Sequence, residues 1–154
     1  MNGRVVIFLD SDVLAPPSLV RRHVQAHESH TRIILDGPVI DIHHEEDLEN
    51  PPFHSWRTKL LSFLDVAGAT FITANTSVAR DELLRAGGFD EDFVWAWEDI
   101  ELGRRLRKAG VGRVKDRAAY VLHCKMEKRS LLELAALKEQ RGEYAGIHNR
   151  QLSR

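Results

Sequence analysis

The sequence predicts an α/β fold in which a layered sheet is flanked by helices. Short runs of β-branched and apolar residues alternate with longer segments of helical periodicity, and this alternation is typical of the class. The first run, residues 4–9, is apolar on both faces, as expected for an interior parallel strand covered on each side. At 154 residues and 43% hydrophobic content, the chain is long and apolar enough to form the core of a domain.

The elements can be placed in order from their periodicity and their end signals. Prolines 16 and 17 precede the first helix, where proline is tolerated, and Gly68, Gly87 and Gly110 end three later helices. In the helix at 97–110, Leu102, Leu106 and Ala109 share one face. The polar segment 41–52 is predicted to be a surface loop. Strands are predicted at 4–9, 32–40, 69–75 and 118–124, and helices at 18–29, 56–68, 78–86, 97–110 and 129–145.

Composition excludes several classes of partner. A formal net charge of −1 gives no field that would attract nucleic acid, so no nucleic-acid partner is expected. No apolar run approaches the roughly 20 residues of a membrane span, and no signal peptide is expected at the N-terminus. The single cysteine, Cys124, fits a reducing compartment. We therefore expect a cytoplasmic protein, with peripheral membrane association through the charged tail left open.

Two carboxylates follow the first predicted strand directly. Side chains two apart on a strand point the same way, so Asp10 and Asp12 are expected to face one site at the carboxyl end of the sheet, where ligands bind in α/β folds. Such oxygen ligands suit Mg²⁺ or Mn²⁺. The alternative is turn chemistry, because aspartate and serine also stabilise exits from strands.

A second pair of carboxylates opens the helix at 97–110. The positive end of the helix dipole favours ionised Glu98 and Asp99, and a carboxylate placed there can accept a proton from a bound hydroxyl. The alternative is the ordinary acidic bias of helix starts. Trp95 and Trp97 flank this pair, and they could either stack on a sugar or serve as packing groups.

Histidines offer three further candidates, each with an ordinary structural explanation. His123 ends a predicted strand at the sheet mouth, where a lone histidine is either a ligand or a structural residue. His23, His27 and His30 recur at helical spacing that could bind Zn²⁺, but no cysteine or carboxylate ligand completes such a site, and a helix face with solvated histidines is the favoured interpretation. The acidic run that begins with His43 and His44 suits an exposed loop better than a metal site.

Taken together, these segments resemble one known family. LDSD, then FITANTSVARDELLRAGGFDEDFVWAWEDIELGRRLRKAG, then AAYVLH are similar in order and spacing to the GT-A fold glycosyltransferases of family 2 type. Within that family the resemblance is closest to the galactosyltransferase-like and chondroitin-polymerase-like branch. It spans roughly residues 4–124 and is densest at 71–110. A D-x-D motif alone is weak evidence for this family, whereas the GGFDE and W-x-ED segments at this spacing are specific to it.

The resemblance implies a metal-dependent, inverting transfer of a hexosyl or N-acetylhexosaminyl group. The donor would be a nucleotide-diphosphate sugar, UDP-linked, and the acceptor a hydroxyl of a saccharide, as in polysaccharide biosynthesis. It implies that Mn²⁺ or Mg²⁺ is held by Asp12, Asp10 and His123, with Asp10 also lying toward the nucleotide ribose.

The resemblance also implies roles for the middle of the chain. The Glu98-Asp99 pair would supply the catalytic carboxylates, with Asp99 as general base. The substrate-binding residues implied in the donor and acceptor cleft are Asn75, Arg80, Trp95 and Trp97. Asn75 stands in Thr-Ala-Asn, where many relatives have Gly-Gly-Asn, and the larger side chains narrow the backbone approach there.

The family's first half has no counterpart here. Family members begin with strand–helix–strand units that bind the base, so we expect residues 1–128 to be the metal-side and acceptor-side part of such a domain, followed by a tail helix at 129–154. The leading hypothesis is a glycosyltransferase, whose activity as this chain alone is left open. A second hypothesis is a non-catalytic remnant that binds a partner or a second copy through an exposed sheet edge. A third, a metal-dependent phosphotransferase or nuclease, leaves GGFDEDF and WEDIELG unexplained.

Overall fold

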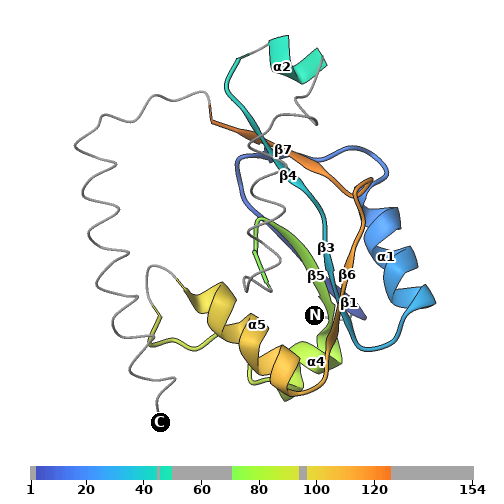
Figure 1. The fold of residues 1–154 in the computed structure, drawn as a ribbon, viewed down its shortest axis with the longest axis vertical. Helices are drawn as coiled ribbons and strands as arrows, with labels where there is room; N and C mark the ends of the chain where they lie inside the picture. The colour runs from blue at the N-terminus through green and yellow to red at the C-terminus, as the bar shows by residue number, and fades with distance from the viewer. Residues whose placement is uncertain (1–2, 45, 50–70, 94–96, 126–154) are drawn as a thin grey trace.

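Two mixed β-sheets form the centre of the protein, in a computed structural model that describes residues 3–44, 46–49, 71–93 and 97–125 (Figure 1). The larger sheet has the strand order β1-β5-β3-β6, with β1 at Val5–Leu9, β5 at Asn75–Ala79, β3 at Ile33–Asp36 and β6 at Gly112–Lys115. The smaller sheet has the order β2-β7-β4, with β2 at Val13–Leu14, β7 at Val121–Cys124 and β4 at Val39–Ile42. The α/β fold class that the sequence predicts is confirmed.

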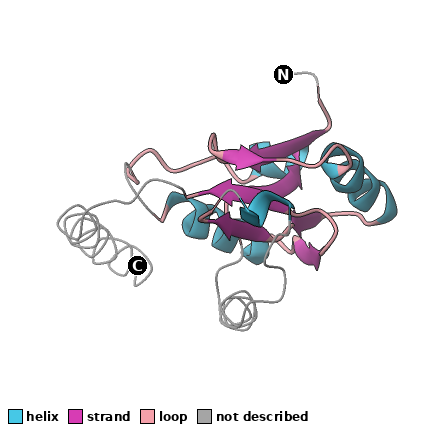
Figure 2. Cartoon of the chain, turned by 90° about the horizontal axis from the view of Figure 1, so that it is seen from above, coloured by secondary structure: helices cyan, strands magenta, loops and turns pink. Residues whose placement is uncertain are grey.

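Helices cover both faces of the larger sheet (Figures 1 and 2). Successive side chains of a strand point to opposite faces, and β5 shows which helix lies on which face. Ser77 of β5 contacts the α1 histidines, whereas Val78 packs with Leu102 of α5. The described helices are α1 at Leu19–Ser29, α2 at Glu46–Glu49, α4 at Arg80–Arg85 and α5 at Glu98–Lys108.

The main core lies between the larger sheet and α5. Leu102 and Leu106 of α5 are fully buried, one helical turn apart, as their spacing predicts. Ala109 does not continue this buried face, because it caps the helix end and is exposed. Phe8 of β1 extends the core toward the carboxyl end of the strand through edge-to-face contacts with Phe71 and Phe89. The cluster consists of Ile34, Phe71, Val78, Leu102, Leu106 and Val111.

The first strand is not the interior parallel strand that its apolar pattern predicts. Among the described strands, β1 pairs only with β5, runs antiparallel to it, and stands at the end of the sheet order. Four of its five residues are half-buried and Leu9 is exposed. A continuous apolar run reports burial of both faces, but it carries no information on strand direction, which is why this prediction is wrong.

The predicted strand at 32–40 is two strands in two different sheets. Gly37 and Pro38 separate β3 from β4, and the chain crosses from the larger to the smaller sheet between them. A Cβ at Gly37 would overlap the carbonyl oxygen of Ala119 and the side chain of Asn75. The crossing therefore requires glycine at this close approach of two backbones. The strand β4 and helix α2 also occupy part of the predicted loop at 41–52.

The third predicted strand is displaced along the sequence. Residues 71–74 form a loop, and β5 begins at Asn75, where a strand prediction for 69–75 ends. The following helix, α4, begins at Arg80 rather than 78, because Val78 and Ala79 pair with β1. Hydrogen bonding on both sides, to β1 and to β3, outweighs the helical pattern at these positions.

The remaining predicted elements agree with the structure to different extents. Helices α1 and α5 are confirmed to within one or two residues, and β7 is a shortened form of the strand predicted at 118–124. The short strands β2 and β6 have no counterpart in the sequence prediction. The helices predicted at 56–68 and in the tail at 129–154 lie outside the described residues.

Candidate active site

The D-x-D segment lies where the chain passes from one sheet to the other. Asp10 directly follows β1 and Asp12 directly precedes β2, and the three residues 10–12 form a turn rather than the end of a strand. Strand alternation is therefore not what brings the two carboxylates together. The turn is held in place because the backbone N–H of Cys124 in β7 donates to the carbonyl oxygen of Asp12, at 2.9 Å.

The three predicted metal ligands converge at this turn. One ligand atom from each of Asp10, Asp12 and His123 can be chosen so that all three lie within 4.8 Å of one another. Nε2 of His123 is 3.0 Å from Oδ2 of Asp12. The side chain of Asp12 is 55% exposed and that of His123 only 15%, so the cluster is anchored on the protein side and reachable from solvent. Among the residues that the structure describes, this is the only group with such ligand geometry.

A carboxylate that the sequence analysis missed lies behind the histidine. Asp41 of β4 and His123 of β7 are register partners in the parallel pair, so their side chains are neighbours on one face. Nδ1 of His123 is 3.1 Å from Oδ1 of Asp41. The prediction of a loop at 41–52 concealed Asp41, and only the pairing of β4 with β7 could reveal it.

The start of α5 lies at the same end of the larger sheet as the D-x-D turn. Leu9, the last residue of β1, is the register partner of Asn75, the first residue of β5. Loop 71–74 leads into Asn75, and the backbone of Thr73 in that loop hydrogen-bonds the Asp99 carboxylate. This chain of contacts places Asp99 beside the sheet end from which Asp10 projects.

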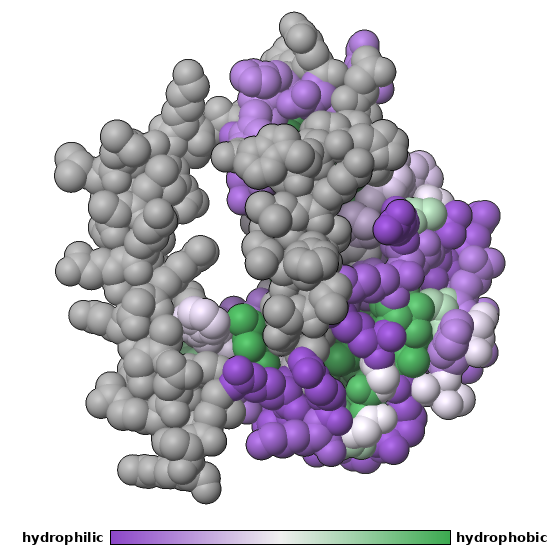
Figure 3. Space-filling model, in the orientation of Figure 1, coloured by the Kyte–Doolittle hydropathy of each residue, from purple (hydrophilic) through white to green (hydrophobic). Residues whose placement is uncertain are grey.

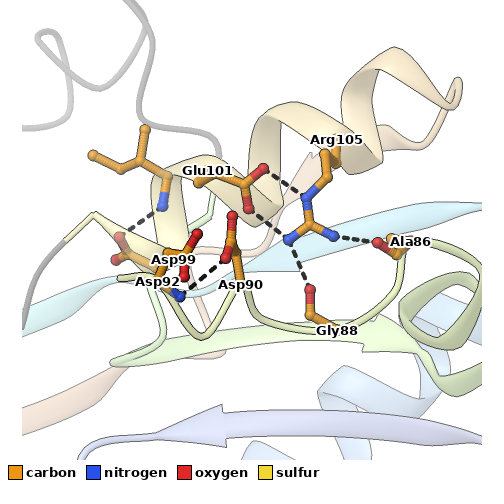
Figure 4. Close-up of polar contacts among 8 residues, drawn as sticks. Ala86, Gly88, Asp90, Asp92, Asp99, Glu101 and Arg105 are labelled. Atoms are coloured by element: carbon orange, nitrogen blue, oxygen red, sulfur yellow. Dashed lines mark hydrogen bonds and ion pairs between the residues drawn. The ribbon is translucent and has the colours of Figure 1, made fainter. Parts of the chain in front are cut away.

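Burial makes Asp99 a stronger base than an ordinary aspartate. Desolvation raises the pKa of its carboxyl, and the nearby charge of Glu98 raises it further. Backbone N–H groups oppose this pKa shift, including that of Ile100, which donates to Oδ1 of Asp99 at 2.7 Å (Figure 4). A carboxylate with a raised pKa, held by backbone donors, suits the acceptance of a proton from a hydroxyl.

The residues that flank Asp99 are strained or incompletely paired. Trp97 begins α5 with a left-handed backbone, φ 77°, which is rare for a bulky residue and costs roughly 1–3 kcal/mol. Oε2 of Glu98 is buried and has no hydrogen-bond partner within the described part of the chain. Trp95, predicted to share the acceptor wall with Trp97, lies outside the described residues.

Arg105 ties α5 to the GGFDEDF segment (Figure 4). Its guanidinium binds both carboxylate oxygens of Glu101, at 2.6 and 2.5 Å, and donates to the backbone carbonyls of Ala86 and Gly88. Gly87 and Gly88 have positive φ values of 84° and 73°, which glycine adopts without strain. Much of the specific spacing in this segment therefore serves to fix the loop against the helix that carries Asp99.

Asn75 lies in the interior rather than on the surface of a site. It is 1% exposed, and its Nδ2 donates to the carbonyl oxygens of Ala119 and Pro38 at 2.7 and 3.1 Å. Its Oδ1 is 3.1 Å from Nε2 of His23 on α1. These contacts favour a structural role, in which Asn75 joins α1, β5 and the crossing between the sheets, over the substrate contact that the resemblance implies.

The same network explains two of the three helix histidines. Because Nδ2 of Asn75 faces two acceptors, its Oδ1 must accept, so Nε2 of His23 donates. Nδ1 of His23 then accepts from the Ser77 hydroxyl at 2.8 Å, and Ser77 Oγ accepts from Nε2 of His27 at 2.9 Å. Burial lowers the pKa of both histidines, which keeps them neutral. The expectation of a solvated helix face is therefore wrong for His23, which is fully buried.

Arg80 lies at the opposite end of the sheet from the metal-ligand cluster. It begins α4 after Ala79, and Ala79 pairs with Val5 at the start of β1. Five strand residues separate that end from Asp10, a span of roughly 15 Å. The structure therefore does not bring Arg80 together with the predicted metal ligands.

The exposed apolar side chains of the described residues do not gather into a second candidate site. The large apolar side chains exposed in the described ranges are spread over several elements, and Figure 3 shows hydrophobic areas separated by hydrophilic ones on the face it presents. Within the same ranges, no helix is both long enough and apolar enough to cross a membrane.

Comparison with known proteins adds a functional context to this geometry. No protein-family model matches the chain. The chain is 28% identical to a Bacillus subtilis protein named as the uncharacterized glycosyltransferase YfnE, over 71% of this chain and 41% of that protein. It is 26% identical to the validoxylamine A glucosyltransferases of two Streptomyces hygroscopicus subspecies, jinggangensis and limoneus, over 88% of this chain.

The similarity to these three proteins supports a relationship to glycosyltransferases. The chain covers 39% and 36% of the two Streptomyces proteins, and so spans about two fifths of the length of the relatives it matches.

Proposed function

We propose that this chain carries the metal-binding and acceptor-side part of an inverting glycosyltransferase that uses a nucleotide-diphosphate sugar, UDP-linked, and a saccharide hydroxyl. The observation that carries the proposal is the convergence of Asp10, Asp12 and His123 at the D-x-D turn. The glycosyltransferase names of the relatives support the reaction class, and the raised pKa of Asp99 supports its role as base.

The residues at the turn fit a divalent cation. Ligands of one such ion, each about 2.1 Å from it, lie up to roughly 4.2 Å apart, so a separation within 4.8 Å needs only small side-chain movements. Two carboxylates and one imidazole form a mixed oxygen and nitrogen set, which favours Mn²⁺ over Mg²⁺. When bound, the cation would neutralise the charge that develops on the departing diphosphate.

The protein's own groups account for the rest of the reaction. The acceptor oxygen forms its bond to the anomeric carbon on the face opposite the diphosphate, the bond from that carbon to the phosphate oxygen breaks, and configuration inverts. The hydroxyl proton passes to the carboxylate of Asp99, whose raised pKa suits it to that step. The backbone N–H of Ile100, which donates to Oδ1 of Asp99, helps to hold this carboxylate in place.

Calorimetry tests the proposal directly. We expect the chain to bind Mn²⁺, and Asp12→Ala and His123→Ala to weaken that binding at least about tenfold because each removes a ligand atom. UDP and a panel of UDP-sugars should then bind in the presence of Mn²⁺ and not in its absence.

Asp81→Asn provides the control, because Asp81 is exposed on α4 and its loss changes the net charge by the same amount. If Mn²⁺ does not bind, or binds equally well to Asp12→Ala, the metal-dependent transferase is excluded and the non-catalytic binding module becomes the better hypothesis.

A further inference from the structure

Asp41 contacts His123 on the side away from the D-x-D turn. The two ring nitrogens of His123 face different carboxylates: Nδ1 is 3.1 Å from Oδ1 of Asp41, and Nε2 is 3.0 Å from Oδ2 of Asp12. The three residues come from adjacent strands or their ends, since β7 lies between β2 and β4 in the smaller sheet. The imidazole of His123 thus lies between the carboxylates of Asp41 and Asp12.

Metal binding at the D-x-D turn decides which nitrogen of His123 carries the proton. Both nitrogens face carboxylate oxygens, which only accept hydrogen bonds, so the two contacts by themselves favour a proton on either nitrogen. A nitrogen that binds a cation must present its lone pair, and Nε2 is the nitrogen on the side of Asp12. In the form of the neutral ring that can bind a cation there, the proton therefore lies on Nδ1, which donates it to Asp41.

The position of Asp41 is fixed by strand pairing and by the ammonium group of Lys125. Asp41 and His123 are register partners in the β4–β7 pair, so the contact between them is set by the backbone. Nζ of Lys125 lies 3.4 Å from the same Oδ1, and the backbone N–H of Lys125 bonds the carbonyl of Ile42 at 2.9 Å. Lys125 therefore forms an ion pair with Asp41 and leaves the histidine ring free to contact the same carboxylate.

We propose that Asp41 is a positioning residue, which holds His123 as the Nδ1–H tautomer so that Nε2 is presented to a divalent cation at Asp10 and Asp12. The proposal rests on the metal site of the proposed function and adds to it a fourth residue, which is a third and non-ligating carboxylate. Such outer carboxylates orient the ring and raise the basicity of the ligating nitrogen.

Metal affinity and tautomer state, measured on the full chain, test this role. We expect Asp41→Ala to weaken Mn²⁺ binding about 10- to 100-fold, and Asp41→Asn to weaken it less, because the amide oxygen still accepts from Nδ1. Nitrogen chemical shifts of His123, recorded without metal, should report a larger share of the Nδ1–H tautomer in the wild type than in Asp41→Ala, because Asp12 alone favours a proton on Nε2. Circular dichroism confirms that each variant is folded.

The outcomes separate the two proposals. If the wild type and Asp81→Asn bind Mn²⁺ and Asp41→Ala binds it equally well, the role of Asp41 is refuted and the metal site stands. If the wild type binds no Mn²⁺, the metal site and the role of Asp41 both fall. If Asp41→Ala loses affinity while its His123 tautomer is unchanged, orientation through the tautomer is refuted.

Discussion

Asp99 lowers the stability of the fold through the same property, a raised carboxyl pKa, that suits it to accept a proton. Its carboxyl is buried next to Glu98, and burial raises its pKa. A raised pKa means that the folded state disfavours the ionised form, so at pH 7 the charge of Asp99 reduces the free energy of unfolding. This destabilisation is absent below the ordinary aspartate pKa, and it is complete once the pH exceeds the raised one.

Replacing Asp99 with asparagine should therefore separate stability from activity. Asparagine keeps an oxygen that accepts from the N–H of Ile100 and removes the desolvated charge, so the melting temperature at pH 7 should stay equal or rise. If Asp99 is the base, as proposed, transfer to the acceptor should fall about 10²- to 10⁴-fold in this variant. Calorimetry and nucleotide-release assays measure the two effects. A variant that retains full transfer would show that Asp99 is not the base.

At the scale of elements, α1 is docked on the larger sheet by a polar network rather than by apolar contacts alone. Hydrogen bonds link His23 and His27 to Ser77, and His23 to Asn75. In this network the donor and the acceptor of each hydrogen bond are fixed by the neighbouring bonds. Buried polar networks of this kind stabilise only when they are fully satisfied. A proton added to His23 would break the pattern, because His23 Nδ1 would then face the Ser77 hydroxyl as a second donor.

This docking predicts a loss of stability in mild acid. Burial lowers the pKa of His23 and His27, so the unfolded chain, with histidine pKa values near 6.5, binds protons more readily than the folded one. Their contribution is complete above about pH 7 and is lost as the pH falls through 6.5 and below. The charges of Asp116 and Asp36 oppose the shift at His23 without reversing it.

Urea unfolding at pH 8, 6 and 5 provides the measurement. The stability of the wild type should fall by up to about 1.4 kcal/mol per pH unit for each extra proton bound on unfolding, and His27→Gln should reduce that slope. Comparing the two proteins at each pH cancels the contribution of carboxylates elsewhere. Equal slopes would contradict this account of the network.

At the scale of the whole molecule, the candidate site depends on how the two sheets are joined. Two of the crossings from the larger to the smaller sheet position carboxylates of the site: the first, at residues 10–12, carries Asp10 and Asp12, and the second, at Gly37-Pro38, leads to Asp41. Asn75 bonds the carbonyls of Pro38 and Ala119, and so holds the second crossing against the approach to β7. The positions of Asp41 and His123 relative to Asp10 follow from this junction.

Gly37→Ala should therefore destabilise the fold far more than the addition of one methyl group usually does. The added Cβ would overlap the carbonyl oxygen of Ala119, which is backbone and cannot move aside alone. We expect a loss of roughly 3 kcal/mol or more in the free energy of unfolding, together with weaker Mn²⁺ binding. Gly112→Ala is the matched control, since its Cβ would meet only an ordinary contact at 3.8 Å. Equal stability of the two variants would disprove the close approach at Gly37.

The sequence by itself determined the α/β class, the helices α1 and α5, and three candidate metal ligands that the structure brings together. Each of these follows from local periodicity, from end signals, or from residues at a recognisable spacing. Asp10, Asp12 and His123 could be named because their side chains carry the chemistry whatever their neighbours are.

Only the tertiary structure decided strand direction, the division of 32–40 into two strands, the burial of Asn75, and the contact of Asp41 with His123. Each of these depends on which segments become neighbours in space. Periodicity along the chain cannot report that choice, because hydrogen bonds between strands distant in sequence make it.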